Sequence, residues 1–168
     1  MTDSIDEICQ LDFVIDTCVL AHACQKHYPL HESAFSLIEW LGSQSEAQWV
    51  LDDNGKKAPA AETSLLYSEY HRTLSPQSLP LMLLARYMRF GLVKFSPRPN
   101  QQLRDKVREM IPKNKKDQVV LGAVAGSQDK VLFSNDEDDF PQEVRQDAAA
   151  ALGVRIYFSD ALNFGNSK

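Results

Sequence analysis

Acidic side chains stand directly after two apolar segments that are typical of buried strands. Asp16 follows the run LDFVI (residues 11–15), and Asp136 follows KVLFS (residues 130–134) after one asparagine. Chemistry in parallel α/β sheets collects at the carboxyl ends of the strands. We therefore expect these two carboxylates to share a site. The acids that continue the second run, in SNDEDD, are equally typical of an acidic loop that begins a helix.

Two further acids occupy helical positions where burial is expected. Asp117 heads a predicted helix, and the apolar residues three, four and seven positions later lie on its face, which should contact the sheet. Glu69 lies in mid-helix, three and four residues after a pair of leucines. Burying an unpaired carboxylate is costly, and a bound cation would remove that cost. The alternatives are a capping role for Asp117 and an edge position for Glu69.

These four acids suggest a metal site if they converge. Carboxylates that meet at strand ends repel one another unless a cation lies between them. Hard oxygen ligands suit Mg²⁺ or Mn²⁺, with water completing the coordination. Such an ion lowers the pKa of bound water and stabilises the transition state of phosphoryl transfer. Because the acids are far apart in the sequence, their convergence is a hypothesis.

The elements that must position these acids alternate along the chain. Helices are expected at residues 18–27, 32–41, 60–74, 101–110, 117–127 and 141–152, with a further helix that ends at Phe90. Strands are expected at residues 11–15, 48–51, 92–95, 130–134 and 154–158. A turn is expected at residues 52–55. Strands separated by helices predict one α/β domain of 168 residues, a three-layer sandwich around a mainly parallel sheet.

Charge is distributed unevenly in this chain. The net charge is −5, yet residues 86–116 contain ten basic and two acidic residues, so they carry +8 and the remainder carries −13. This division lets a cationic surface lie near an anionic one, although a solvated helix face explains it equally well. Lys113, Lys115 and Lys116 directly precede Asp117. We expect these lysines to bind phosphate groups of an anionic partner close to Asp117.

Composition narrows the class of protein. The chain is 43% apolar and 24% charged, which argues against extended disorder, collagen and coiled coil. No apolar run approaches the roughly 18 residues of a membrane span. The acidic beginning MTDSIDEICQLD lacks the pattern of a signal peptide, and three cysteines are too few for a disulfide framework. We therefore expect a cytoplasmic protein.

Three blocks of the sequence resemble the PIN-domain ribonucleases. FVIDTCVLAHA is similar to the opening strand of that family with its Asp and Thr, and SLLYSEYHRTL is similar to its central helix with a Glu. KKDQVVLGAVAGSQDKVLFSNDEDDF resembles its Asp-headed helix, next strand, Ser/Thr-x-Asp and further Asp before Phe. The resemblance covers about residues 11–158.

This resemblance implies a PIN-like fold and a Mg²⁺- or Mn²⁺-dependent endoribonuclease. It assigns the catalytic and metal-binding roles to Asp16, Glu69, Asp117 and Asp136, with Asp139 as an auxiliary ligand and Thr17, Ser134 and Asn135 in support. It also implies a homodimer that acts as the toxin of a toxin–antitoxin pair, with an antitoxin protein as partner. Two features depart from the family pattern. Cys18 replaces a common Asn or Ser, and Glu62 rivals Glu69 as the second acid.

Other classes of protein remain as alternatives. A structural zinc site at Cys18, His22, Cys24, His27 and His31 is disfavoured, because these side chains divide between two helix faces. A haloacid-dehalogenase-like phosphatase needs an acid where Cys18 stands. No glycine-rich phosphate-binding loop is present. A PIN-like module that binds RNA or protein without cleavage, and a nuclease that acts on DNA, both stay open.

Overall fold

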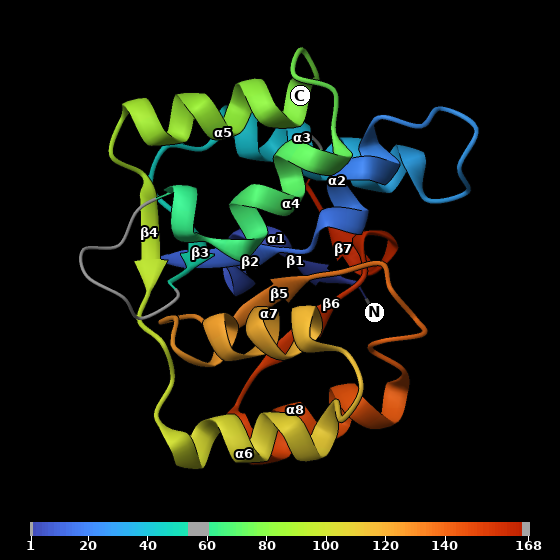
Figure 1. Ribbon diagram of the computed structural model, residues 1–168. Helices are drawn as coiled ribbons and strands as arrows, with labels where there is room; N and C mark the ends of the chain where they lie inside the picture. Colours follow the sequence, from blue (N-terminus) through green and yellow to red (C-terminus); the bar gives the residue numbers. More distant parts are fainter. Residues whose placement is uncertain (1, 54–60, 166–168) are drawn as a thin grey trace.

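The computed structural model of this chain describes residues 2–53 and 61–165, without the side chain of Glu62. Its centre is a parallel sheet of five strands in the order β4-β3-β2-β5-β6 (Figure 1). The strands are β2 (Asp12–Ile15), β3 (Gln48–Asp52), β4 (Val93–Ser96), β5 (Val131–Phe133) and β6 (Arg155–Tyr157). All five expected strands are present, and the apolar runs of β2, β3 and β5 are buried in the core.

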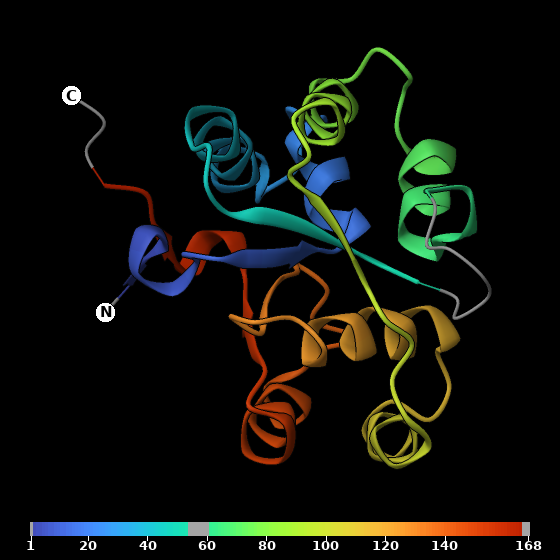
Figure 2. The same ribbon diagram turned by 90° about the vertical axis from the view of Figure 1, so that its left-hand side faces the viewer.

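Helices cover both faces of this sheet and confirm the predicted three-layer α/β sandwich (Figure 2). One layer contains α2 (Thr17–Ala23), α3 (His31–Ser43) and α5 (Leu79–Arg89), and the opposite layer contains α6 (Gln101–Met110), α7 (Lys115–Ala125) and α8 (Gln142–Leu152). The remaining helix, α4 (Leu65–Thr73), contacts α2, α7 and β3. The terminal segments pair through β1 (Asp3–Ser4) and β7 (Leu162–Asn163), and α1 (Ile5–Ile8) follows β1.

Several element boundaries differ from the expected ones for local reasons. The helix expected at 18–27 ends at Ala23, and the segment 60–74 divides into a 3₁₀ turn (Ala61–Thr63) and α4, with Ser64 as the N-cap of α4. The helix of Asp117 begins two residues earlier, because the side chain of Asn114 accepts hydrogen bonds from the first free backbone N–H groups. Residues 54 and 55 of the expected turn lie outside the described part of the chain.

The connections between strands reverse direction in the middle of the sheet. From β2 the chain proceeds to its neighbour β3 and then β4, whereas from β5 it proceeds to β6 on the other side. Ligand sites of parallel α/β sheets lie where the connections diverge in this way, beyond the carboxyl ends of the two central strands. That position falls between the ends of β2 and β5. Among the described residues, no helix combines the length and apolar character that crossing a membrane requires.

Candidate functional site

Asp16 lies at the point where the chain connections diverge. It follows β2 directly and is fully buried, and its backbone N–H donates to the carbonyl of Phe133 at the end of β5 (2.9 Å). The Ser134 hydroxyl donates to Asp16 Oδ2 (2.9 Å), whereas Asp16 Oδ1 is buried and accepts no hydrogen bond. One carboxylate oxygen is therefore fixed by the fold and the other is left for a cation.

Asp117 reaches the same place from α7. The apolar face of α7 packs against β2, β3 and β5, and Asp117 shares this face and is fully buried, as its spacing predicted. Asn114 caps the helix, so Asp117 is not the capping residue, and neither of its carboxylate oxygens accepts a hydrogen bond. Burial raises the pKa of the Asp117 carboxyl to about 8, and the facing carboxyl of Asp139 adds to the rise.

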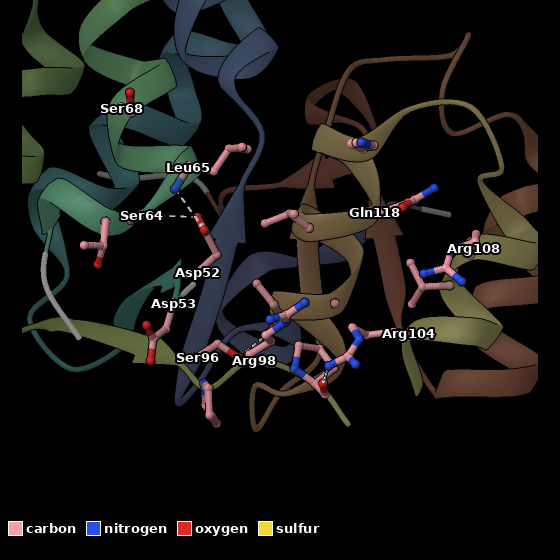
Figure 3. Close-up of a pocket in the computed structure, with 18 of the residues that line it drawn as sticks. Asp52, Asp53, Ser64, Leu65, Ser68, Ser96, Arg98, Arg104, Arg108 and Gln118 are labelled. Atoms are coloured by element: carbon pink, nitrogen blue, oxygen red, sulfur yellow. Dashed lines mark hydrogen bonds between the residues drawn. The ribbon is translucent and has the colours of Figure 1, made fainter. Parts of the chain in front are cut away.

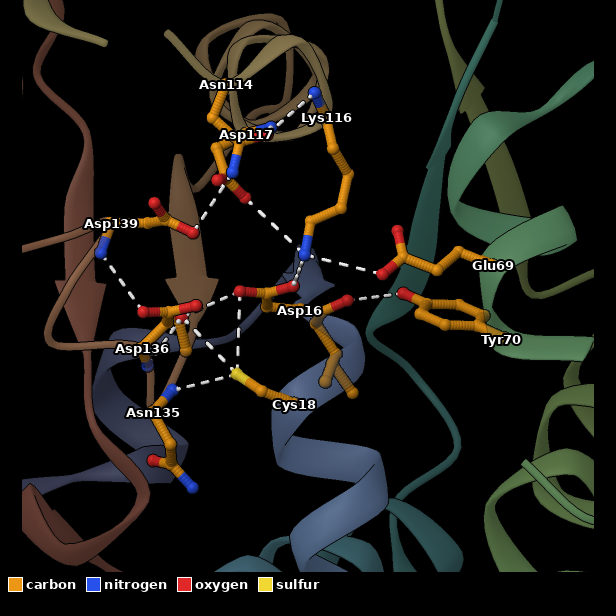
Figure 4. A network of polar contacts seen from close by, with 12 residues as sticks. Asp16, Cys18, Glu69, Tyr70, Asn114, Lys116, Asp117, Asn135, Asp136 and Asp139 are labelled. Carbon is orange, nitrogen blue, oxygen red and sulfur yellow. Dashed lines mark hydrogen bonds and ion pairs between the residues drawn. The ribbon is translucent and has the colours of Figure 1, made fainter. Parts of the chain in front are cut away.

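Glu69 contributes the third carboxylate, from the middle of α4. Its side chain is 13% exposed and its Oε2 atom is buried without a hydrogen-bond donor. Leu66 of the expected apolar face is buried, but Leu65 is 40% exposed, so Glu69 lies at the margin of that face. The next residue, Tyr70, donates its hydroxyl to the carbonyl of Ile15 and holds α4 against the end of β2 (Figure 4).

Lys116 lies among these three acids, which the sequence did not indicate. Its Nζ is 3.5 Å from Asp16 Oδ1, 3.4 Å from Glu69 Oε1 and 3.6 Å from Asp117 Oδ1 (Figure 4). Although burial lowers it, the three carboxylates together raise the pKa of Lys116 above the ordinary lysine value. The amine is therefore charged at neutral pH. We call Asp16, Glu69, Asp117 and Lys116 the central cluster.

Asp136 and Asp139 form a second tier beside the central cluster. Asp136 Oδ1 accepts hydrogen bonds from the backbone N–H groups of Asp138 (3.1 Å) and Asp139 (3.0 Å), so this oxygen also supports the loop. Asp139 Oδ2 accepts from Asn114 Nδ2 (3.2 Å). Burial raises the pKa of the Asp136 carboxyl, the hydrogen bond from the backbone N–H of Asp139 opposes that rise, and the Asp139 carboxyl adds to it. Sequence reasoning missed Asn114, although an asparagine three residues before an acid is a helix-start signal.

The predicted supporting residues differ in what they contact. Ser134 bridges the two tiers, because its hydroxyl also accepts from the backbone N–H of Asp136 (3.2 Å). Asn135 accepts from the backbone N–H of Ser159 (2.9 Å), and its Nδ2 lies 3.2 Å from Nδ1 of His22. The Thr17 hydroxyl is buried without a partner. Asn135 therefore supports the loop rather than the carboxylates.

Cys18 also points at Asp16, from the first turn of α2. Its thiol donates to Asp16 Oδ2 at 3.5 Å, and burial together with Asp16 raises its pKa to about 12. The thiol is thus a neutral, weak donor at neutral pH. His22 stacks on Tyr28 with 3.7 Å between ring centroids, and both Cys18 Sγ and His22 Nδ1 lie within hydrogen-bond distance of Asn135.

Two other buried carboxylates show what a structural aspartate looks like in this fold. Asp12 is 1% exposed and accepts from the backbone N–H groups of Gln128 and Asp129. Asp52 is 5% exposed and accepts from Ser64 Oγ and from the first N–H groups of α4. Both carboxylates have their oxygens satisfied by the protein. Asp16 and Asp117 do not, which separates the central cluster from ordinary buried acids.

A groove with several basic residues in its lining lies next to the central cluster, and Figure 3 shows residues that line it. This cavity of about 900 Å³ lies between the start of α4, the ends of β3 and β4, and the helices α6 and α7. Its apolar lining includes Leu65, Val107 and Val119. Its basic residues are Arg98, Arg104, Arg108, Lys113 and Lys115. Ser68 and Lys115 line the groove, and the residues that follow them in the chain, Glu69 and Lys116, belong to the cluster.

The donor atoms of the central cluster fit a divalent metal ion in kind. Among the described residues, four carboxylate oxygens are buried without a hydrogen bond: Oδ1 of Asp16, Oε2 of Glu69, and Oδ1 and Oδ2 of Asp117. Hard oxygen donors of this type are those that Mg²⁺ and Mn²⁺ prefer. Within residues 2–53 and 61–165, however, no three His, Cys, Asp or Glu side chains are arranged so that they could hold a metal as they stand. The ammonium of Lys116 lies between them.

Comparison with known proteins does not place this chain in a family. No model of a protein family matches the sequence, and a search of the curated proteins finds no match. The likeness to PIN-domain ribonucleases therefore rests on the three sequence blocks described above. The fold class and the positions of the acids are observations on this chain itself.

Proposed function

We propose that this protein is a metal-dependent endoribonuclease that hydrolyses phosphodiester bonds of RNA. The observation that supports this proposal most strongly is the pair Asp16 and Asp117. Two fully buried carboxylates from different elements meet beyond the diverging strands, and three of their oxygens accept no hydrogen bond from the described residues. Leaving such atoms without a hydrogen bond in the interior is costly, and a bound cation offsets that cost.

In this proposal Asp16, Glu69 and Asp117 hold the ion. Asp136 offers its second oxygen, and Asp139 helps to orient Asp117. Such an ion polarises a phosphodiester and makes water a stronger nucleophile at neutral pH. Ser134 keeps Asp16 in place through its 2.9 Å hydrogen bond. Asn114 fixes the residue at which α7 begins and thereby how deeply the Asp117 side chain is buried.

The groove supplies a path for the substrate in an otherwise acidic protein. Lys113 and Lys115 at its rim are exposed and lie close in sequence to the cluster, so they suit the phosphates on one side of the cleaved bond. The apolar lining between the basic residues offers contact area to nucleobases of a single strand. This arrangement favours single-stranded or loop RNA over a duplex, whose bases are stacked inside.

The decisive experiment is a cleavage assay on single-stranded RNA with purified protein. We expect no cleavage in EDTA, and cleavage that saturates as Mn²⁺ or Mg²⁺ is added. A matched single-stranded DNA tests whether the 2′-hydroxyl is required. Binding of RNA without cleavage at any metal concentration would favour the non-catalytic binding module. Cleavage of DNA alone would replace the ribonuclease by a deoxyribonuclease.

A role as the toxin of a toxin–antitoxin pair belongs to the same proposal. It requires an antitoxin protein that binds this chain and suppresses its cleavage of RNA, and a homodimer as the active form. The test is the molar mass of the protein in solution, together with growth of cells that express the wild type or Asp16→Asn. A toxin arrests growth only when its cluster is intact.

A further inference from the structure

Lys116 is in electrostatic contact with the central cluster but does not satisfy its hydrogen-bonding capacity. Its three N···O distances, 3.4 to 3.6 Å, exceed the roughly 2.7–2.9 Å of charge-assisted hydrogen bonds. For this reason Asp16 Oδ1 and Asp117 Oδ1 remain without hydrogen bonds although an ammonium is near. The lysine thus balances charge in a space whose donor atoms suit a smaller and more highly charged ion.

The position of Lys116 in the fold allows its ammonium to move out of the central cluster. It lies in the first turn of α7, and its side chain is 28% exposed, whereas Asp16 and Asp117 are fully buried. A lysine side chain is a flexible four-carbon stem, so the ammonium can move to solvent without a shift of the helix. The preceding residue, Lys115, already lines the groove. A displaced Lys116 would therefore move toward the surface where we place the phosphates.

We propose that Lys116 is a built-in counter-ion that competes with the divalent metal for the central cluster. This inference rests on the proposed function, because it concerns the same metal. Without metal, the ammonium balances the negative charge of the cluster and keeps its acids in place. With metal, the ammonium is expelled, because two cations cannot share the cluster without mutual repulsion. Lys116 thereby lowers the metal affinity of the protein and raises the stability of its metal-free form.

The first test is calorimetric titration of Mn²⁺ into the wild type, Lys116→Met and the matched control Lys115→Met. Lys116→Met should bind Mn²⁺ more tightly than the wild type by about tenfold or more, a ratio typical of coupled sites. Lys115→Met, which removes a charge next in the chain but outside the cluster, should bind as the wild type does. Equal affinity in Lys116→Met and the wild type would overturn the inference.

The second test measures displacement itself, by labelling with an amine-reactive reagent and mass spectrometry. Labelling of Lys116 should increase when Mn²⁺ is added, while labelling of the exposed Lys26 should stay constant. Unchanged or reduced labelling of Lys116 at saturating Mn²⁺ would show that the ammonium stays in place. That result would overturn the inference even if the calorimetric difference were found.

A thermal melt separates this inference from the proposed function. In EDTA, Lys116→Met should unfold at a lower temperature than the wild type, and Mn²⁺ should stabilise it by a larger increment. If it is unfolded in EDTA and folds on addition of Mn²⁺, the inference is supported, and Lys116→Gln serves for the calorimetry. If Asp16→Asn abolishes Mn²⁺ binding and Lys116→Met leaves the Mn²⁺ affinity unchanged, only the inference about Lys116 is wrong. If no variant binds Mn²⁺, the proposed metal requirement is wrong as well.

Discussion

The central cluster and the cationic groove lie side by side, but the charges of the cluster are buried and those of the groove are exposed. The cluster places Asp16 and Asp117 where water does not reach, so each charge depends on a specific neighbour. The groove keeps Lys113 and Lys115 exposed, where hydration already satisfies them. A buried charge is costly unless paired, whereas an exposed charge costs little and contributes over a longer range. Changes in the cluster should therefore have the larger effects, and changes in the groove should have smaller, salt-dependent ones.

The largest expected effect is loss of cleavage in Asp16→Asn. The substitution preserves shape and the hydrogen bond from Ser134 but removes one ligand charge. Removing outer partners of metal ligands costs about 10- to 100-fold, so loss of a ligand should exceed about 100-fold. The exposed Asp160→Asn is the matched control and should cleave as the wild type does. Cleavage by folded Asp16→Asn at the wild-type rate would contradict the larger effect that we expect for changes in the cluster than in the groove.

Glu69→Gln should have the next largest effect, a loss of about tenfold in activity and metal affinity. Its side chain is less buried than those of Asp16 and Asp117, and glutamine keeps one carbonyl oxygen as a ligand. Glu62→Gln is the comparison, since Glu62 is the rival second acid, and it should lose less. A greater loss in Glu62→Gln would assign the second acid to that residue.

The groove is tested by RNA affinity as a function of salt, in the Asp16→Asn background so that the RNA stays intact. Changing Lys113 and Lys115 to Ala should reduce the log–log slope by about 1.4, since each phosphate contact on a single strand contributes roughly 0.7. Removing two exposed charges elsewhere, with Lys26→Ala and Arg89→Ala, should leave the slope nearly unchanged. Equal slopes in all three proteins would place the RNA outside this end of the groove.

The stability of the metal-free protein should also depend on pH through Asp117. Asp117 has a pKa of about 8 in the folded protein, against an ordinary value of 3.8. Between these values the folded state binds more protons than the unfolded state, so stability should fall as the pH rises from about 4 to 8. One such group changes the free energy of unfolding by at most about 1.4 kcal/mol per pH unit.

This dependence is measured by urea denaturation in EDTA at several pH values. Asp117→Asn has no proton to lose, so its decline should be shallower than that of the wild type. Asp160→Asn, an exposed acid, should decline as the wild type does. Parallel curves for all three proteins would show that Asp117 is not the group that keeps its proton in the folded state.

Local sequence patterns predicted most of the strands and helices of the fold. The apolar runs that became β2 and β5 could be located because a strand that is covered on both faces needs several consecutive apolar residues. The three-residue and four-residue spacing behind Asp117 placed its carboxylate on the buried face of α7, and the structure confirms that burial. Boundaries were harder to predict, because they depend on single side chains such as Asn114, which caps α7 so that the helix begins two residues before the expected start.

Only the tertiary structure decided which acids are satisfied and which are not. Asp52 also ends a strand, yet three donors from Ser64 and the start of α4 satisfy it, whereas Asp16 keeps a free oxygen. The sequence placed Lys116 with the other basic residues, because its neighbours are lysines. The fold turns its ammonium toward three carboxylates from β2, α4 and α7. Sequence determined the elements because periodicity is local, whereas the pairing of buried charges depends on residues about 50 to 100 positions apart, which only packing brings together.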